Sequence, residues 1–137
     1  MSGHESQKEA QLWLRYAKED LAAAEGLIEH ILTPRHVCFL SQQSAEKAIK
    51  AVLVFSQIDF PRTHDLEALL QIVPDEWKVK ESRVDLPPLS EWAVEARYPG
   101  DWPEATMEEA QKALNLAKRV YELVASDLEK QGLVLER

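Results

Sequence analysis

Apolar residues recur every three or four positions over long stretches of the chain, which is the spacing of one face of an α-helix. In the first stretch these positions are Trp13, Ala17, Leu21, Ala24, Ile28 and Ile31. In the last stretch they are Met107, Ala110, Leu114, Ala117, Tyr121, Val124 and Leu128. Each pattern predicts an amphipathic helix that buries one face.

A further long helix is predicted from about Arg35 to Gln57. Thr33 is expected to be its N-cap, and Pro34 suits its first turn. Because the preceding turn is only a few residues long, this helix should pack antiparallel to the first one. Small side chains on one face would let a neighbouring helix approach closely. They are Ser41, Ser44, Ala48 and Ala51, closing on Phe55.

Two shorter helices are predicted between the second and the last long helix. Thr63 can cap one that spans about residues 64–73, and the other should span about residues 88–98. The stretch 73–88 between them is expected to be irregular. Thr106 and Glu109 have the spacing of a capping box at the start of the last helix. Since no strand signal is convincing, the chain is predicted to be an all-α bundle.

Composition narrows the class of protein. The 137 residues are enough for one domain, 1–137, with its own core at about 10–131. Apolar residues make up 45% of the chain, which favours an ordered fold. Lys and Arg number 16 against 24 Asp and Glu, so the formal charge is −8. This balance argues against an extended basic surface for duplex DNA, although it permits a local basic pocket.

The types of site that the sequence lacks are also informative. Cys38 is the only cysteine, which is typical of a reducing cytoplasm. The N-terminus has no apolar signal core, and no apolar run is long enough to span a membrane. There is no Gly-rich phosphate loop, no nucleophile elbow and no metal-ligand spacing. We therefore expect a cytoplasmic protein without a metal or a cofactor.

Polar residues on the second helix have two interpretations. Gln43, Lys47 and Lys50 lie at positions i, i+4 and i+7, so they share a face. They can form a solvated helix edge, with Glu46 and Lys50 as an ordinary i, i+4 ion pair, or they can contact a phosphate. Asp20, beside the apolar seam of the first helix, is expected to pair with one of the two lysines.

Two further clusters lie at helix ends. Arg62 and His64 precede a predicted helix N-terminus, which favours anions, whereas Asp65 already supplies a negative charge there. His64 can therefore be a ligand contact or a capping and packing residue. Arg97 and Tyr98 lie at a predicted helix C-terminus, where a cation suits the dipole.

Together these segments resemble the HEPN domain (higher eukaryote and prokaryote nucleotide-binding). The resemblance is carried by WLRYAKEDLAAAEGLI, HVCFLSQQSAEKAIKAVLV, FPRTHDLEALL and EARYPGDWPEATMEEAQKALNLAKRVYELV. These segments cover about Trp13 to Leu128 in order. The resemblance implies an antiparallel up-and-down bundle of four to five helices, usually assembled as a homodimer or a higher oligomer.

The resemblance also implies a function. HEPN domains are thought to bind nucleotides or RNA, and many act with a nucleotidyltransferase as a toxin–antitoxin pair. At matching positions, the polar residues of the family motifs are Asp20, Gln43, Glu46, Lys47, Lys50, His64, Asp65, Arg97 and Tyr98. With these residues in one set, a ligand cleft becomes a better interpretation of the lysines than a solvated edge.

The sequence departs from the family's ribonucleases in one respect. Those members have an arginine followed by a histidine after four to six residues, and no arginine of this chain has such a partner. A metal-independent RNA endonuclease would need Arg97 or Lys50 to hold the scissile phosphate while His64 acts as the general acid or base. The departure favours a non-catalytic or weakly catalytic module that binds a nucleotide or a partner protein. A purely structural interaction partner is the third possibility, and full mutual pairing of the polar set would favour it.

Overall fold

The computed structural model describes residues 2–30, 33–81, 86–92 and 104–135, and this part of the chain contains helices and no strand. The helices are α1 (Gly3–Glu29), α2 (Pro34–Phe55), α3 (Leu66–Ile72), α4 (Lys78–Glu81), α5 (Pro87–Ser90) and α6 (Met107–Lys130). The prediction of an all-α bundle with three long helices is confirmed. No described helix combines the length and the apolar character that a membrane span requires.

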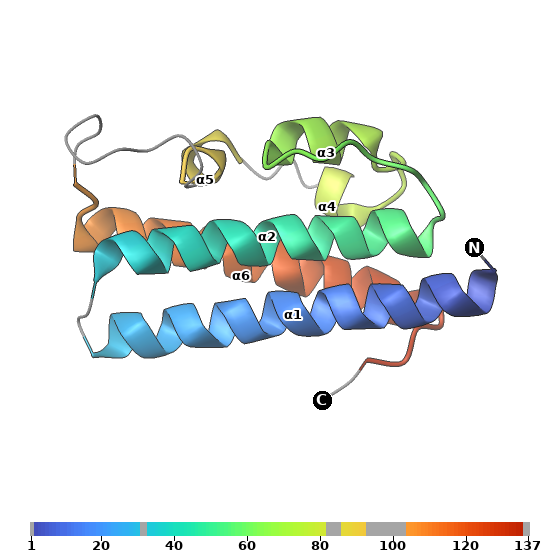
Figure 1. Ribbon diagram of the computed structural model, residues 1–137, viewed down its shortest axis with the longest axis horizontal. Helices are drawn as coiled ribbons and strands as arrows, with labels where there is room; N and C mark the ends of the chain where they lie inside the picture. Colours follow the sequence, from blue (N-terminus) through green and yellow to red (C-terminus); the bar gives the residue numbers. More distant parts are fainter. Residues whose placement is uncertain (1, 31–32, 82–85, 93–103, 136–137) are drawn as a thin grey trace.

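The three long helices lie side by side, and α1 and α2 are antiparallel as predicted (Figure 1). Helix α6 packs against both and runs in the same direction as α2 (Figure 1). It can do so because the chain between these two helices returns to the end of the bundle where α2 begins. That returning segment contains α3, α4 and α5, which cover α2 and α6 on the side away from α1 (Figure 1).

Small side chains allow α1 and α2 to pack closely. Ser41, Ser44, Ala48 and Ala51 are all fully buried. The Ser44 hydroxyl donates a hydrogen bond of 2.7 Å to the backbone oxygen of Ala17 on α1. The predicted stripe of small residues is therefore used inside the molecule, between two of its own helices.

The buried face of α1 is rotated slightly from the predicted one. Its fully buried apolar residues are Ala10, Leu14, Ala17, Leu21 and Ala24. Trp13 and Ile28, which the sequence pattern placed on the seam, are only partly buried at its edge. The predicted seam residue Ile31 lies outside the described residues. This rotation leaves Trp13 facing α2 near the surface.

Two of the long helices begin differently from each other. At α6 the capping box is confirmed, because the Thr106 hydroxyl accepts from Glu109 N at 3.1 Å and the Glu109 carboxylate accepts from Thr106 N at 3.0 Å. At α2, Thr33 occupies the N-cap position but its side chain caps nothing. Its backbone has a φ of 35°, and only its carbonyl oxygen accepts, from His36 N at 3.0 Å.

The cap of α3 differs from the prediction in a way that matters for the site. Asp65, not Thr63, is the N-cap, and its carboxylate accepts from the backbone N–H groups of Glu67 and Ala68. The Thr63 hydroxyl instead accepts from Asp65 N at 3.1 Å. Helix α3 therefore begins two residues later than predicted. As a result His64 lies in the segment before the helix, beside α2.

The remaining short helices also differ from the predictions. Helix α4 lies within the stretch 73–88, which was predicted to be irregular. Helix α5 covers the start of the helix predicted for 88–98, and residues 93–98 lie outside the described part of the chain. The Ser90 hydroxyl of α5 accepts from Leu66 N at 3.1 Å, which joins α5 to the start of α3.

Candidate functional site

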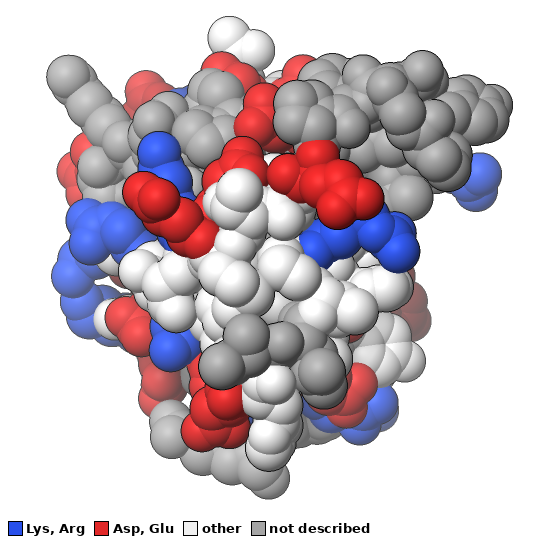
Figure 2. Space-filling view, turned by 90° about the vertical axis from the view of Figure 1, so that its left-hand side faces the viewer, with Lys and Arg blue, Asp and Glu red and all other residues white. Residues whose placement is uncertain are grey.

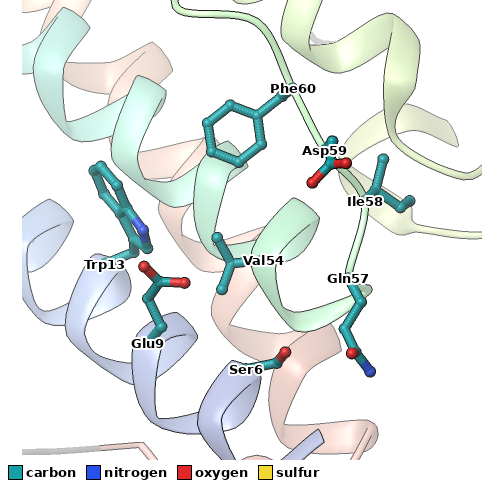
Figure 3. A pocket seen from close by; sticks show the side chains of 8 residues that line it. All are labelled: Ser6, Glu9, Trp13, Val54, Gln57, Ile58, Asp59 and Phe60. Atoms are coloured by element: carbon teal, nitrogen blue, oxygen red, sulfur yellow. The ribbon is translucent and has the colours of Figure 1, made fainter. Parts of the chain in front are cut away.

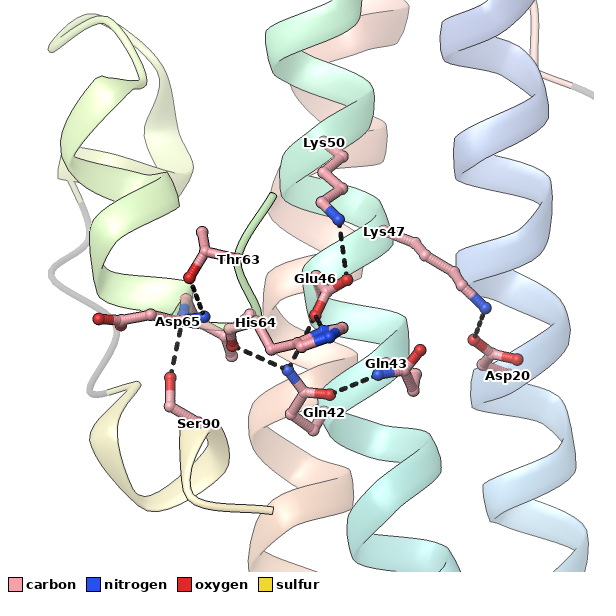
Figure 4. A network of polar contacts seen from close by, with 11 residues as sticks. Asp20, Gln42, Gln43, Glu46, Lys47, Lys50, Thr63, His64, Asp65 and Ser90 are labelled. Atoms are coloured by element: carbon pink, nitrogen blue, oxygen red, sulfur yellow. Dashed lines mark hydrogen bonds and ion pairs between the residues drawn. The ribbon is translucent and has the colours of Figure 1, made fainter. Parts of the chain in front are cut away.

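Four polar residues meet at the side of α2 that faces α3, and we call them the Glu46 network. Glu46 is at its centre, with only 5% of its side chain exposed. One carboxylate oxygen accepts from Lys50 Nζ at 2.9 Å, and the other lies 2.8 Å from His64 Nδ1 (Figure 4). Gln42 Nε2 donates to that second oxygen at 3.2 Å. A buried carboxylate thus holds a lysine and a histidine in fixed positions.

Helical spacing and one loop bring these residues together. Gln42, Glu46 and Lys50 lie four residues apart on α2, so their side chains line one face. His64 comes from the segment before α3, and its backbone oxygen accepts from Gln42 Nε2 at 3.1 Å. Gln42 therefore fixes both the carboxylate and the loop that carries the histidine.

The surroundings of Glu46 act on its charge in opposite directions. Burial raises the pKa of the Glu46 carboxyl, but the hydrogen bonds from Lys50, His64 and Gln42 outweigh burial. The pKa of Glu46 consequently lies below its ordinary value of 4.5. The carboxylate is ionised at neutral pH, and its oxygen accepts the proton that His64 Nδ1 carries.

Lys50 is held by aromatic rings as well as by Glu46. Its Nζ lies 5.5 Å from the centroid of the Trp13 ring and 5.7 Å from that of Phe60. At these distances a cation is attracted to the face of each ring. The contacts of Lys50 with Trp13 and Phe60 could not be predicted from the sequence, because they join segments that are distant along the chain. Helical spacing gives no signal for such contacts.

Lys47 belongs to a separate contact. Its Nζ lies 2.6 Å from a carboxylate oxygen of Asp20, which confirms the predicted pairing between α1 and α2. Both side chains are partly exposed, at 24% and 19%. Figure 4 shows Lys47 directed toward α1, away from the Glu46 network. The two lysines of α2 therefore do not converge on one point.

The other predicted site residues have different positions. Gln43 Nε2 donates to the side-chain oxygen of Gln42 at 2.8 Å, at the edge of the network. Asp65 is exposed and caps α3. Arg97 and Tyr98 lie outside the described residues. Within the described part of the chain, the structure brings together three of the predicted residues, namely Glu46, Lys50 and His64.

His64 is the most accessible titratable member of the network, with 37% of its side chain exposed. Its ring is oriented by Glu46, so it can exchange a proton or contact an anion at the surface. The described residues contain no group of three His, Cys, Asp or Glu side chains that could hold a metal ion. On the end of the molecule seen in Figure 2, acidic and basic side chains are interspersed around uncharged residues, without a continuous basic patch among the coloured ones.

Comparison with known proteins gives matches over most of the chain. The family model described as the HEPN domain matches residues 10–130. The chain is 36% identical to "Putative toxin MJ1304" of Methanocaldococcus jannaschii, over 92% of this chain and 93% of that protein.

Two solved structures have a similar fold. TT1696 from Thermus thermophilus superimposes with a TM-score of 0.70 and 26% identity, covering 85% of this chain and 96% of that one. The structure of ST0689, described as an archaeal HEPN homologue, gives a TM-score of 0.69 and 28% identity, covering 87% and 97%. The sequence and fold comparisons therefore agree.

Proposed function

Because the chain belongs to the HEPN domain family, we propose that it is a toxin-like HEPN module that binds a nucleotide or RNA. The proposed partner is a nucleotidyltransferase that acts with it as a toxin–antitoxin pair. The toxin class is supported by the relative named "Putative toxin MJ1304", which matches almost the whole chain. Ligand and partner are inferences from the site and from the family.

The observation that carries the proposal is the contact between Glu46 and His64. A buried, ionised carboxylate 2.8 Å from Nδ1 holds the imidazole in a fixed orientation at the surface. Lys50 Nζ adds a cation on the other oxygen of the same carboxylate, at 2.9 Å. A phosphate group is the ligand that such a site fits, since charged nitrogen donors bind phosphate strongly.

A thermal-shift experiment with nucleotides and short RNA tests this proposal. A ligand at about 100 times its Kd should stabilise the protein by about 2.7 kcal/mol and raise Tm. His64→Ala should abolish the rise. His4→Ala is the matched control, since His4 is exposed at the start of α1, and it should keep the rise. No shift with any nucleotide or RNA, or an equal shift in both variants, would contradict the proposal.

A second function, metal-independent RNA cleavage, is favoured by the same contact. A carboxylate that fixes the ring of a histidine is an arrangement suited to general acid–base catalysis. Cleavage of the RNA can be followed in the same samples, in the presence of a chelator and after repurification. Cleavage that disappears in His64→Ala and persists in His4→Ala would identify a ribonuclease, whereas a shift without cleavage supports the binding module.

The ion pairs favour a third function, a structural interaction partner. Lys47 is paired with Asp20 and Lys50 with Glu46, so both lysines of α2 already have internal partners. Under this alternative the polar set stabilises the bundle, and the protein acts through its surface. This alternative predicts three results together. No thermal shift occurs with nucleotides or RNA, no RNA is cleaved, and the protein nevertheless captures a nucleotidyltransferase.

A further inference from the structure

A pocket of about 470 Å³ lies between the first half of α1 and the segment that follows α2 (Figure 3). Its volume is in the range of small-molecule sites, roughly 300–1,000 Å³. The rings of Trp13 and Phe60 form part of its wall, and Val54 and Ile58 add apolar surface. The polar residues of the lining are Ser6, Glu9, Gln57 and Asp59.

The charge of this pocket is negative. Glu9 on α1 and Asp59 after α2 approach the space from opposite sides (Figure 3). Among the described residues neither carboxylate has a basic side chain within ion-pair distance. Lys50 is the nearby cation, and Glu46 already compensates its charge. Within the part of the chain that the structure describes, two carboxylates are thus left without a counter-charge beside two aromatic rings.

The lining of the pocket also includes a buried hydroxyl group that has no hydrogen-bond partner among the described residues. Ser6 is 1% exposed, and its Oγ has no hydrogen-bond partner within the described part of the chain. Buried polar groups normally have a partner, because leaving one unpaired costs free energy. A ligand that donates a hydrogen bond would provide the missing partner at the base of the pocket.

We propose that this pocket binds an organic cation, namely a ligand that ends in an alkylammonium or a guanidinium group. The two carboxylates attract such cations, and the rings of Trp13 and Phe60, which already hold Lys50 Nζ, provide apolar surface for the carbon part of the ligand. The N–H groups of the cation can donate to Ser6 Oγ and to both carboxylates. A phosphate would be repelled by Glu9 and Asp59, so this site differs in ligand class from the Glu46 network. The cation can be a free diamine or a basic side chain of a polypeptide.

Isothermal titration with two probes tests the proposal and distinguishes the sources. Agmatine represents the free cation, and a short peptide whose only charged group is one central arginine represents a side chain. Binding should be weakened about tenfold, equivalent to about 1.4 kcal/mol, by Glu9→Gln and by Asp59→Asn. Glu29→Gln is the matched control, because it removes one exposed carboxylate from the opposite end of the same helix.

Each result of the titration either supports the proposal or overturns it. Agmatine binding that depends on Glu9 and Asp59 supports a free cation as the ligand, and binding of the peptide alone supports a polypeptide side chain. Absence of binding by both probes overturns the proposal. An equal loss in Glu29→Gln overturns it too, because it would show general attraction to an acidic surface. These results do not depend on nucleotide binding, so the two proposals succeed or fail separately.

Discussion

Glu46 determines the character of the candidate site. The sequence predicts its i, i+4 pair with Lys50, which lies 2.9 Å away in the structure. Sequence spacing could not predict the burial of that pair, because the segment that brings His64 over Glu46 is 18 residues further along the chain. The ion pair that would lie at a solvated helix edge under one interpretation of the sequence is therefore part of a partly buried network. Its contribution to stability should be larger than that of an exposed i, i+4 pair.

Replacement of Glu46 should make the protein less stable in a pH-dependent way. Glu46→Gln should lower the free energy of unfolding by about 3 kcal/mol at neutral pH, because Lys50 loses its buried counter-charge. The pKa of Glu46 is below 4.5 in the folded protein, so the stabilisation by its ionised form is complete above that pH. It is lost as the pH falls through the folded-state pKa.

Urea unfolding of both proteins, from about pH 7 to about pH 3, measures this effect. The difference in free energy of unfolding between the wild type and Glu46→Gln should shrink at the acid end. A difference that stays constant over the whole range would show that the ionised carboxylate is not the stabilising group.

The two lysines of α2 should differ in their contribution to stability. Lys50→Ala leaves Glu46 buried with one cation fewer and removes the contacts with two rings, so we expect a loss of about 2–3 kcal/mol. Lys47→Ala breaks a pair whose side chains are 24% and 19% exposed, and we expect a loss below about 1 kcal/mol. Denaturant titration of the two variants provides the comparison, and equal losses would contradict the distinction.

At the scale of elements, helix ends were predictable where the capping groups are neighbours in sequence. Thr106 and Glu109 form a reciprocal box that the sequence alone identifies. At α3 two candidate caps compete, and Asp65 prevails over Thr63 because its carboxylate accepts two backbone N–H groups. At α2 the backbone of Thr33 is left-handed and its side chain makes no capping hydrogen bond, which residue type alone does not reveal.

Two helices end in the same backbone motif with different residues. Gln57 follows α2 with a φ of 56°, and Ile58 N donates to Leu53 O at 2.9 Å. Gly132 follows α6 with a φ of 95°, and Leu133 N donates to Leu128 O at 2.9 Å. This is the left-handed ending that favours glycine, so Gln57 is strained where Gly132 is not.

Substitutions at Gln57 and at Gly132 should change the free energy of unfolding in opposite directions. Gln57→Gly should raise the free energy of unfolding by about 0.5 kcal/mol, because the relief of strain exceeds the added freedom of the unfolded chain. Gly132→Ala should lower it by about 1 kcal/mol, although a Cβ there meets no atom within 4 Å. Thermal unfolding of the two variants measures both signs, and a change of the same sign would contradict this explanation.

At the scale of the whole molecule, the sequence predicted the three long helices and the contact between α1 and α2. Their apolar periods are strong, and the intervening turn is short. The predictions were weaker for the chain between α2 and α6, because helices as short as α4 and α5 depend on their neighbours and not on their own pattern. The pocket lined by Glu9 and Asp59 could not be predicted, since it joins α1 to a turn about fifty residues away.

The division of the Glu46 network between two parts of the fold has a kinetic consequence. Glu46 and Lys50 lie on α2, in the rigid centre of the bundle, whereas His64 is attached to α3, a helix of 7 residues. A helix this short persists only while it is docked, so it belongs to the segments that open first in native-state hydrogen exchange. Each such opening would separate the imidazole from its carboxylate without unfolding the long helices. We therefore expect the lifetime of the assembled site to depend on the detachment rate of this one short helix and not on the global stability of the protein.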